Sequence, residues 1–188
     1  PMANIKIIRN GLFFDGTGAP GKTTDVVIKD GKVDQIGPAP AIEGAQEIDA
    51  TGCWVTPGFL DIHTHYDAEV EVMPGLEESV RHGVTTVVFG NCSLSSAVGT
   101  QDDILNLFSR VENMPIDILQ DWIDNKITWK ITTEYYEHLD TLPVGPNISS
   151  FIGHSNIRIA VMGLNRSLTV AKANQDEIKG MQRIVDEA

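Results

Sequence analysis

Short apolar runs separated by turn-forming residues fill the first 56 positions and predict a β-rich region. We expect strands over 5–8, 12–14, 25–29, 32–36, 47–49 and 53–55. Asn10-Gly11 and Asp30-Gly31 separate neighbouring runs, and both pairs favour hairpin turns because they tolerate positive φ. Four to six short strands without a helix predict the N-terminal part of a small β-sandwich, residues 1–56, which needs further strands to cover its second face.

From Thr56 onward, strand and helix patterns alternate. We expect strands over 58–63, 84–89 and 148–152, and helices over 74–82, 104–111, 135–139 and 176–187. The almost continuous β-branched run 84–89 is typical of a parallel strand that is buried on both faces. The alternation predicts an α/β fold for residues 57–188, with the first three β/α units of a (β/α)8 TIM-type barrel. The barrel would be incomplete, because such a barrel needs about 250 residues. An open three-stranded parallel sheet is the alternative.

The charge and the apolar content narrow the classes of partner. The chain has 14 Lys and Arg residues against 26 Asp and Glu residues, a formal net charge of −12. We therefore expect neither a nucleic acid nor an anionic membrane as partner. No apolar run approaches the roughly 20 residues of a membrane span, and we see no signal peptide.

The cysteines, Cys53 and Cys92, are too far apart for a disulfide framework. We expect a cytoplasmic protein with free thiols and with Cys53 in the core.

The candidate chemistry begins where the strand 58–63 ends. His63 and His65 are two residues apart, so both imidazoles would point to one face of an extended chain. Neutral imidazoles bind Zn²⁺ well, although this pattern alone is more often formed by ordinary surface or packed histidines. Asp61 lies two residues before His63, so its carboxylate would point to the same face and could accept a hydrogen bond from a ligand imidazole. The alternative is that Asp61 is an ordinary strand-end aspartate that pairs with another group.

Two further residues follow the ends of the next strands. Cys92 comes after the strand 84–89, and neighbouring parallel strands lie about 4.8 Å apart. Its thiolate could join the two histidines on one metal ion or bridge two ions; the alternative is a buried free cysteine that acts as a small hydrophobic residue. His154 closes the strand candidate 148–152 and could line the same site, with a role as metal ligand less favoured.

Three segments carry a family resemblance. Residues 56–67, Thr-Pro-Gly-Phe-Leu-Asp-Ile-His-Thr-His-Tyr-Asp, resemble the signature of the amidohydrolase superfamily. Residues 83–93, which contain Cys92, and residues 151–163 resemble the D-aminoacylase branch, the N-acyl-D-amino-acid deacylases. The resemblance covers essentially the whole chain, and the three segments together are specific to that branch.

The resemblance implies a (β/α)8 barrel with a β-sandwich built from both chain ends. It implies that His63, His65 and Cys92 are metal ligands for zinc, as one or two ions, with other divalent metals as alternatives. It also implies two more ligand histidines and a catalytic aspartate on strands five, six and eight. We therefore expect no catalytic residue in this chain, an aspartate beyond residue 188 and no activity of the fragment alone.

The implied function is metal-dependent hydrolysis of the amide bond of a small-molecule substrate, an N-acyl-D-amino acid. The D-stereochemistry rests on resemblance alone. One alternative is a cyclic amidase of the same superfamily that resembles dihydropyrimidinase. Another is a non-catalytic module or assembly partner. We also expect the isolated fragment to self-associate through an exposed apolar sheet edge.

Overall fold

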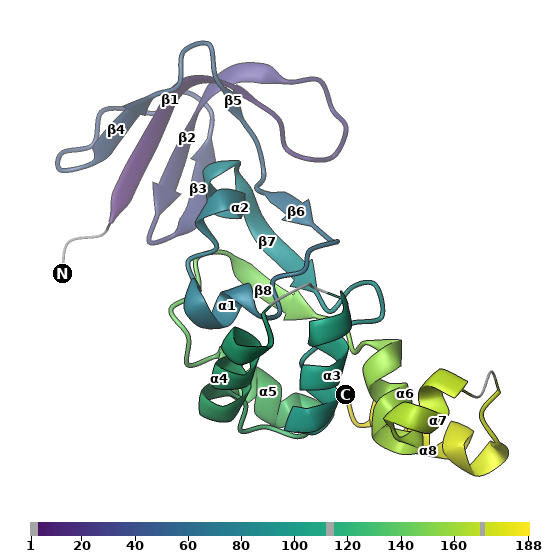
Figure 1. Ribbon diagram of the computed structural model, residues 1–188. Coiled ribbons are helices and arrows are strands. Elements are labelled where there is room, and N and C mark those ends of the chain that lie inside the picture. The colour runs from purple at the N-terminus through teal and green to yellow at the C-terminus, as the bar shows by residue number, and fades with distance from the viewer. Residues whose placement is uncertain (1–3, 112–114, 170–171) are drawn as a thin grey trace. The chain divides into compact units, whose positions relative to one another are not determined.

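The computed structural model describes residues 4–111, 115–169 and 172–188, and the chain divides after Pro57 into two units (Figure 1). The first unit is a five-stranded sheet of order β3-β2-β1-β4, with β5 also paired to β1. Its strands are β1 (Ile5–Phe13), β2 (Lys22–Lys29), β3 (Lys32–Ile36), β4 (Gln46–Asp49) and β5 (Trp54–Val55). β2 pairs antiparallel with both β1 and β3, whereas β4 and β5 lie parallel to β1.

The two hairpin signals of the first unit have different outcomes. Asp30-Gly31 forms the expected turn between β2 and β3, with φ angles of 50° and 80°. The prediction of a hairpin at Asn10-Gly11 is wrong, because β1 continues through both residues with a register shift against β2. Asn10 has a φ of 59°, and a Cβ on Gly11 would lie 2.4 Å from the Val55 side chain. The pair therefore forms a bulge where β1 changes its partner from β4 to β5.

Much of the apolar surface of this unit is exposed. Ile7, Val26 and Val27 are buried, but Val33 on β3 and Trp54 on β5 are exposed. The prediction that Cys53 belongs to the core is wrong, since Cys53 is exposed next to the turn that precedes β5. A single sheet has two faces to cover, so the β-sandwich remains a prediction.

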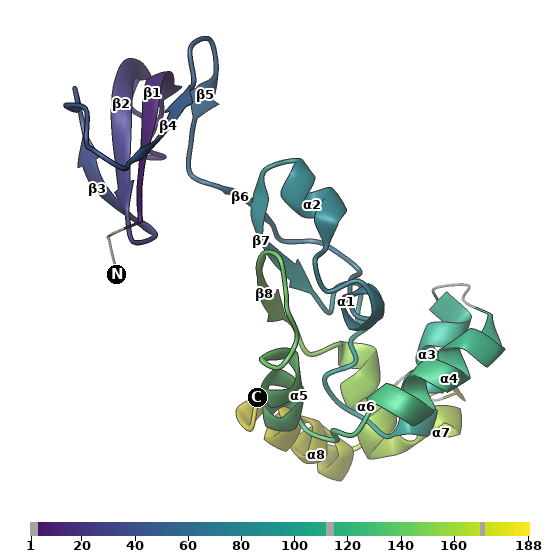
Figure 2. The same ribbon diagram turned by 90° about the vertical axis from the view of Figure 1, so that its left-hand side faces the viewer.

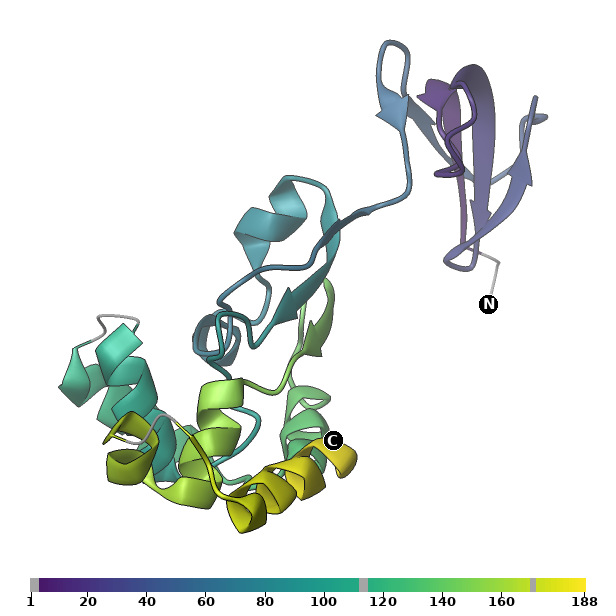
Figure 3. The ribbon, with the colours of Figure 1, turned by 90° about the vertical axis from the view of Figure 1, so that its right-hand side faces the viewer.

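The second unit contains a three-stranded parallel sheet of order β6-β7-β8, and the expected α/β organisation is confirmed. The strands are β6 (Phe59–Asp61), β7 (Val84–Phe89) and β8 (Asn147–Ser150). The helices are α1 (Glu69–Val72), α2 (Glu77–Arg81), α3 (Gln101–Val111), α4 (Ile116–Lys126), α5 (Thr132–Leu139), α6 (His154–Met162), α7 (Leu164–Thr169) and α8 (Gln175–Asp186). Figures 2 and 3 show α2 alongside β7, and α6 packs against α3, α7 and α8.

Several elements of the second unit differ from the sequence prediction. The helix expected over 74–82 begins only at Glu77, because the buried Leu76 has a left-handed φ of 44°. The third strand ends at Ser150 instead of continuing to residue 152, and α6 begins at His154. α4 was not expected, although Leu119, Trp122 and Ile123 have helical spacing and are buried together.

The core of the second unit surrounds the carboxyl end of β7. Val87 and Phe89 are fully buried and pack with apolar residues of the surrounding helices, including Ile104, Leu119 and Tyr135. The loop that follows β7 is itself buried over much of its length, and the Trp129 indole N–H donates to its Ser96 carbonyl at 2.6 Å. Among the described residues, no helix has the length and apolar character to span a membrane.

An N-terminal cap fixes the start of α8. The Asn174 side chain accepts from the Glu177 N–H group at 2.9 Å, and the Glu177 carboxylate accepts from the Asn174 N–H group at 2.7 Å. The Arg166 guanidinium donates to the same carboxylate. Together these contacts lower the pKa of Glu177 from 4.5 to about 2, and the Arg166 hydrogen bond is the largest cause. The ionised carboxylate therefore stabilises the start of α8.

We expect Glu177→Gln to accelerate amide hydrogen exchange in α8 at neutral pH. A lowered folded-state pKa means that the stabilisation is present above the unfolded value of 4.5 and is lost as the pH falls toward 2. The difference between variant and wild type should therefore shrink as the pH falls through this window. Glu187→Gln at the other end of α8 is the matched control. Equal exchange in Glu177→Gln and wild type at pH 7 would contradict the prediction.

Candidate metal centre

His63 and His65 lie just beyond the end of β6, on either side of a firmly held residue. Thr64 between them is buried, and its N–H and hydroxyl groups both donate to the Val88 carbonyl, at 3.1 and 2.9 Å. These bonds fasten the segment to β7 with Thr64 directed inward. The two histidine side chains remain exposed, and their ring centroids are 5.7 Å apart.

Cys92 is presented by a strained turn after β7. Cys92 and Ser93 have φ angles of 51° and 72°, in a region that side-chain-bearing residues rarely adopt. The Asn91 amide donates to the carbonyls of Val88 at 2.9 Å and Thr64 at 3.3 Å. The Ser93 hydroxyl accepts a hydrogen bond from the Ser155 N–H group at 2.9 Å. Contacts on both sides therefore hold the turn, and such contacts offset the strain that it stores.

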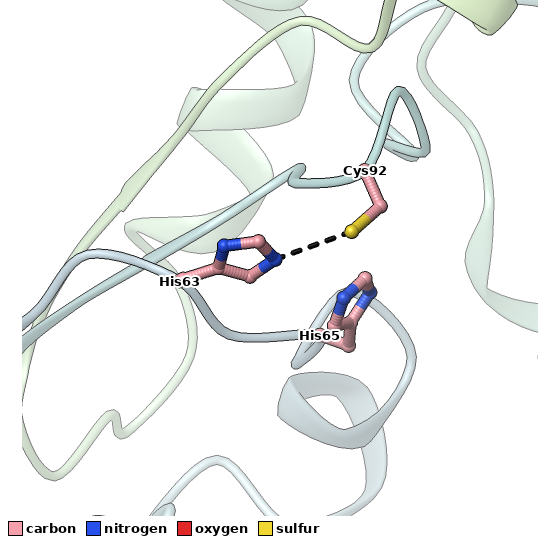
Figure 4. A group of neighbouring side chains, drawn as sticks. All are labelled: His63, His65 and Cys92. Carbon is pink, nitrogen blue, oxygen red and sulfur yellow. Dashed lines mark hydrogen bonds between the residues drawn. The ribbon is translucent and has the colours of Figure 1, made fainter.

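The three side chains form one cluster. His63 Nε2 lies 3.2 Å from Cys92 Sγ, and the ligand atoms of His63, His65 and Cys92 all lie within 4.8 Å of one another (Figure 4). Zn–N and Zn–S bonds of about 2.0 and 2.3 Å with tetrahedral angles place such atoms about 3.5 Å apart. Two imidazoles and a thiolate also form a donor set that suits zinc. The cluster therefore fits one divalent ion.

Asp61 and His154 lie outside this three-residue group. Asp61 Oδ1 accepts from the backbone N–H group of His63 at 3.2 Å, which orients the main chain of the segment that carries His63 and His65. His154 is the exposed first residue of α6 and lines a separate cavity of about 270 Å³ with Ile178 and Met181 of α8. Their predicted roles as site-lining residues stay predictions.

Asp67 is a supporting residue to which the sequence reasoning assigned no role. It is 1% exposed, and it accepts from the N–H groups of Gly90 at 3.1 Å and Ser96 at 3.3 Å, one on each side of Cys92. Burial raises its pKa to about 6, against the lowering effect of the two hydrogen bonds. The spacing of Asp67, two residues after His65 and four after His63, was the one sequence feature that linked it to the site. Its function, however, depends on a loop that lies more than twenty residues away in sequence.

A second buried carboxylate, that of Glu71, fastens the helix that follows His63 and His65. Both oxygens of Glu71 lie 2.9 Å from His138 Nε2, and the Glu71 side chain is 1% exposed. The His138 ring stacks on Trp129 with centroids 4.6 Å apart. This contact ties α1 to α5, so the segment after His65 is held at both ends.

Residues 46–188 match the model of the amidohydrolase family. An uncharacterized protein of Mycobacterium tuberculosis is 48% identical over 185 residues, 97% of this chain and 30% of that protein. The N-acyl-D-aspartate deacylase of Alcaligenes xylosoxydans xylosoxydans is 30% identical over 185 residues, 97% of this chain and 34% of that enzyme. The chain thus spans about a third of the length of these curated relatives.

Among solved structures, the chain is similar to the N-acyl-D-glutamate deacylase of Bordetella bronchiseptica in complex with zinc and a phosphonate inhibitor that mimics the tetrahedral intermediate. The TM-score is 0.76 at 29% identity, over 95% of this chain and 35% of that one. The resemblance to amidohydrolases of the D-aminoacylase branch is therefore confirmed.

We expect Cys92→Ala to lower the zinc affinity of the native-length protein by more than about tenfold, because it removes one of the three clustered donors. Zinc content after dialysis against buffered metal would measure the change. Cys53→Ala is the matched control, since Cys53 is also a free, exposed cysteine but lies in the first unit. Retention of full zinc affinity in Cys92→Ala would remove Cys92 from the ligand set.

We expect Asp67→Ala to lower the free energy of unfolding by about 3 kcal/mol, because it leaves the N–H groups of Gly90 and Ser96 buried without an acceptor. Asp67→Asn should lose less, since the amide oxygen can still accept one of the two bonds. Urea unfolding of the native-length protein would measure both. Wild-type stability in Asp67→Ala would show that these bonds do not hold the turn.

Proposed function

Because the chain belongs to the amidohydrolase family, we propose that this protein is a metal-dependent deacylase of N-acyl-D-amino acids. The observation that carries the proposal is the cluster of His63, His65 and Cys92 at the carboxyl ends of two parallel strands. In barrels built from such units, these strand ends carry the catalytic groups. Similarity to deacylases of N-acyl-D-aspartate and N-acyl-D-glutamate supports the substrate class.

In this proposal the residues of the chain hold and orient the metal. The imidazoles of His63 and His65 bind as neutral donors, and Cys92 binds as a thiolate. Thr64 and Asp67 fix the two loops that carry these ligands. A bound divalent ion supplies Lewis-acid polarisation of the scissile carbonyl and a water molecule of lowered pKa. We propose zinc, as one or two ions, because zinc suits the nitrogen and sulfur donors.

Proton transfer completes the proposed reaction. Hydrolysis of an amide requires a base that takes a proton from water and an acid that gives a proton to the leaving amine. We assign neither role to a residue of this chain. By the family resemblance, an aspartate outside residues 1–188 performs both.

The free thiols of Cys53 and Cys92 support a reducing compartment, so we propose a cytoplasmic location.

We expect the native-length protein with zinc to hydrolyse N-acetyl-D-amino acids and to leave the L enantiomers intact. Amine release measured over a panel of amino acids would test this, and a chelator should abolish the activity until zinc is added back. Ring opening of hydantoin or dihydrouracil without release of N-acetyl groups would instead favour a cyclic amidase. Inactivity of the zinc-loaded protein on every member of both panels would contradict the proposal of an amide-hydrolysing enzyme.

A further inference from the structure

A cavity of about 510 Å³ lies beside the metal cluster. Its size falls within the range of about 300 to 1,000 Å³ that is usual for small-molecule sites. His65 forms part of its wall, so the cavity begins at a proposed metal ligand. α1 and its flanking residues contribute Ala68, Val72 and Met73.

The opposite wall is apolar and firmly packed. It consists of Phe108 from α3 with Ile118 and Trp122 from α4. The rings of Phe108 and Trp122 pack edge to face with centroids 5.7 Å apart, and both residues are almost fully buried. Ile118 is 57% exposed and therefore belongs to the rim. Buried aromatic rings make a preformed floor, and an apolar ligand gains free energy by leaving water for such a surface.

The charge of the residues that line the cavity indicates which half of the proposed substrate would bind there. An N-acyl amino acid has an anionic half, which carries the carboxylate, and an acyl half, which extends from the scissile carbonyl. The described residues that line the cavity include Glu69 but no Lys or Arg. A carboxylate placed there would meet like charge and no cation, which costs free energy. An acyl chain has no charge and matches the apolar wall.

We infer that this cavity receives the acyl chain of the substrate and that the protein accepts chains longer than acetyl. The inference rests on the proposed deacylase function, because the scissile carbonyl would lie at the metal next to His65. The acyl chain then extends between the α1 segment and the wall of α3 and α4. Chain length, rather than the amino-acid side chain, is the specificity that these residues control.

The test compares two isoleucines on one helix. Ile118→Trp places a larger side chain at the rim of the cavity, whereas Ile116→Trp makes the same change at an exposed position outside the lining. We would measure kcat/KM of the native-length protein for the N-octanoyl and N-acetyl derivatives of one D-amino acid. Wild type should prefer the octanoyl substrate, since each buried methylene group contributes about fourfold. Ile118→Trp should lower the octanoyl-to-acetyl ratio by about tenfold or more, and Ile116→Trp should leave it unchanged.

Binding of a neutral probe separates this inference from the proposed function. By calorimetry, octanamide should bind the wild-type protein more tightly than acetamide, and Ile118→Trp should remove most of that advantage. This result would support the cavity as an apolar-chain site even if neither substrate were hydrolysed, an outcome that would defeat the deacylase proposal alone. Equal binding of octanamide and acetamide would overturn the inference. An unchanged octanoyl-to-acetyl ratio in Ile118→Trp would also overturn it.

Discussion

The buried carboxylate of Asp67 is the constraint on which the arrangement of His63, His65 and Cys92 depends. It lies two residues after His65 and binds the backbone N–H groups of Gly90 and Ser96, on either side of the Cys92 turn. One side chain therefore joins the loops that follow β6 and β7. Burial disfavours its ionised form and raises its pKa to about 6, and the two N–H donors act against that cost. An apolar residue there would avoid the desolvation cost but would leave both donors unpaired.

This arrangement allows a strained turn to present Cys92, the proposed metal ligand. The left-handed φ angles of Cys92 and Ser93 are unfavourable for residues with side chains. The turn persists because contacts with the neighbouring segments restrict it on both sides, through Asn91 to the Thr64 carbonyl and through Ser93 to Ser155. Segments that follow all three parallel strands therefore take part in placing one sulfur atom. The hydrogen bonds that offset the strain are made by residues outside the proposed ligand set.

The sequence predicted features that depend on neighbouring residues better than features that depend on distant ones. The β-branched run 84–89 forms β7, and Asp30-Gly31 forms its turn, because local pattern and tertiary structure agree there. Asn10-Gly11 has the same turn chemistry, but β4 and β5 pair with β1 on either side of it and convert it to a bulge. At the site, residue spacing and strand adjacency indicated that His63, His65 and Cys92 could lie together, and the family resemblance made this the expectation. The role of Asp67 required knowledge of which distant N–H groups the fold leaves without acceptors.

The segment that follows β6 connects the proposed metal centre to the adjacent cavity. His65 contributes to both, and Ala68 and Val72 line the cavity one helical turn apart. Glu71 in the same turn is buried on the other side, where His138 holds it. α1 therefore has one face fixed to the core and another that faces the cavity. Because Asp67 and Glu71 anchor this short segment, a change in the cavity wall cannot be absorbed by free movement of α1. His65 and α1 would therefore act as one anchored element, which would bind the proposed metal at one end and line the acyl-chain cavity along its length.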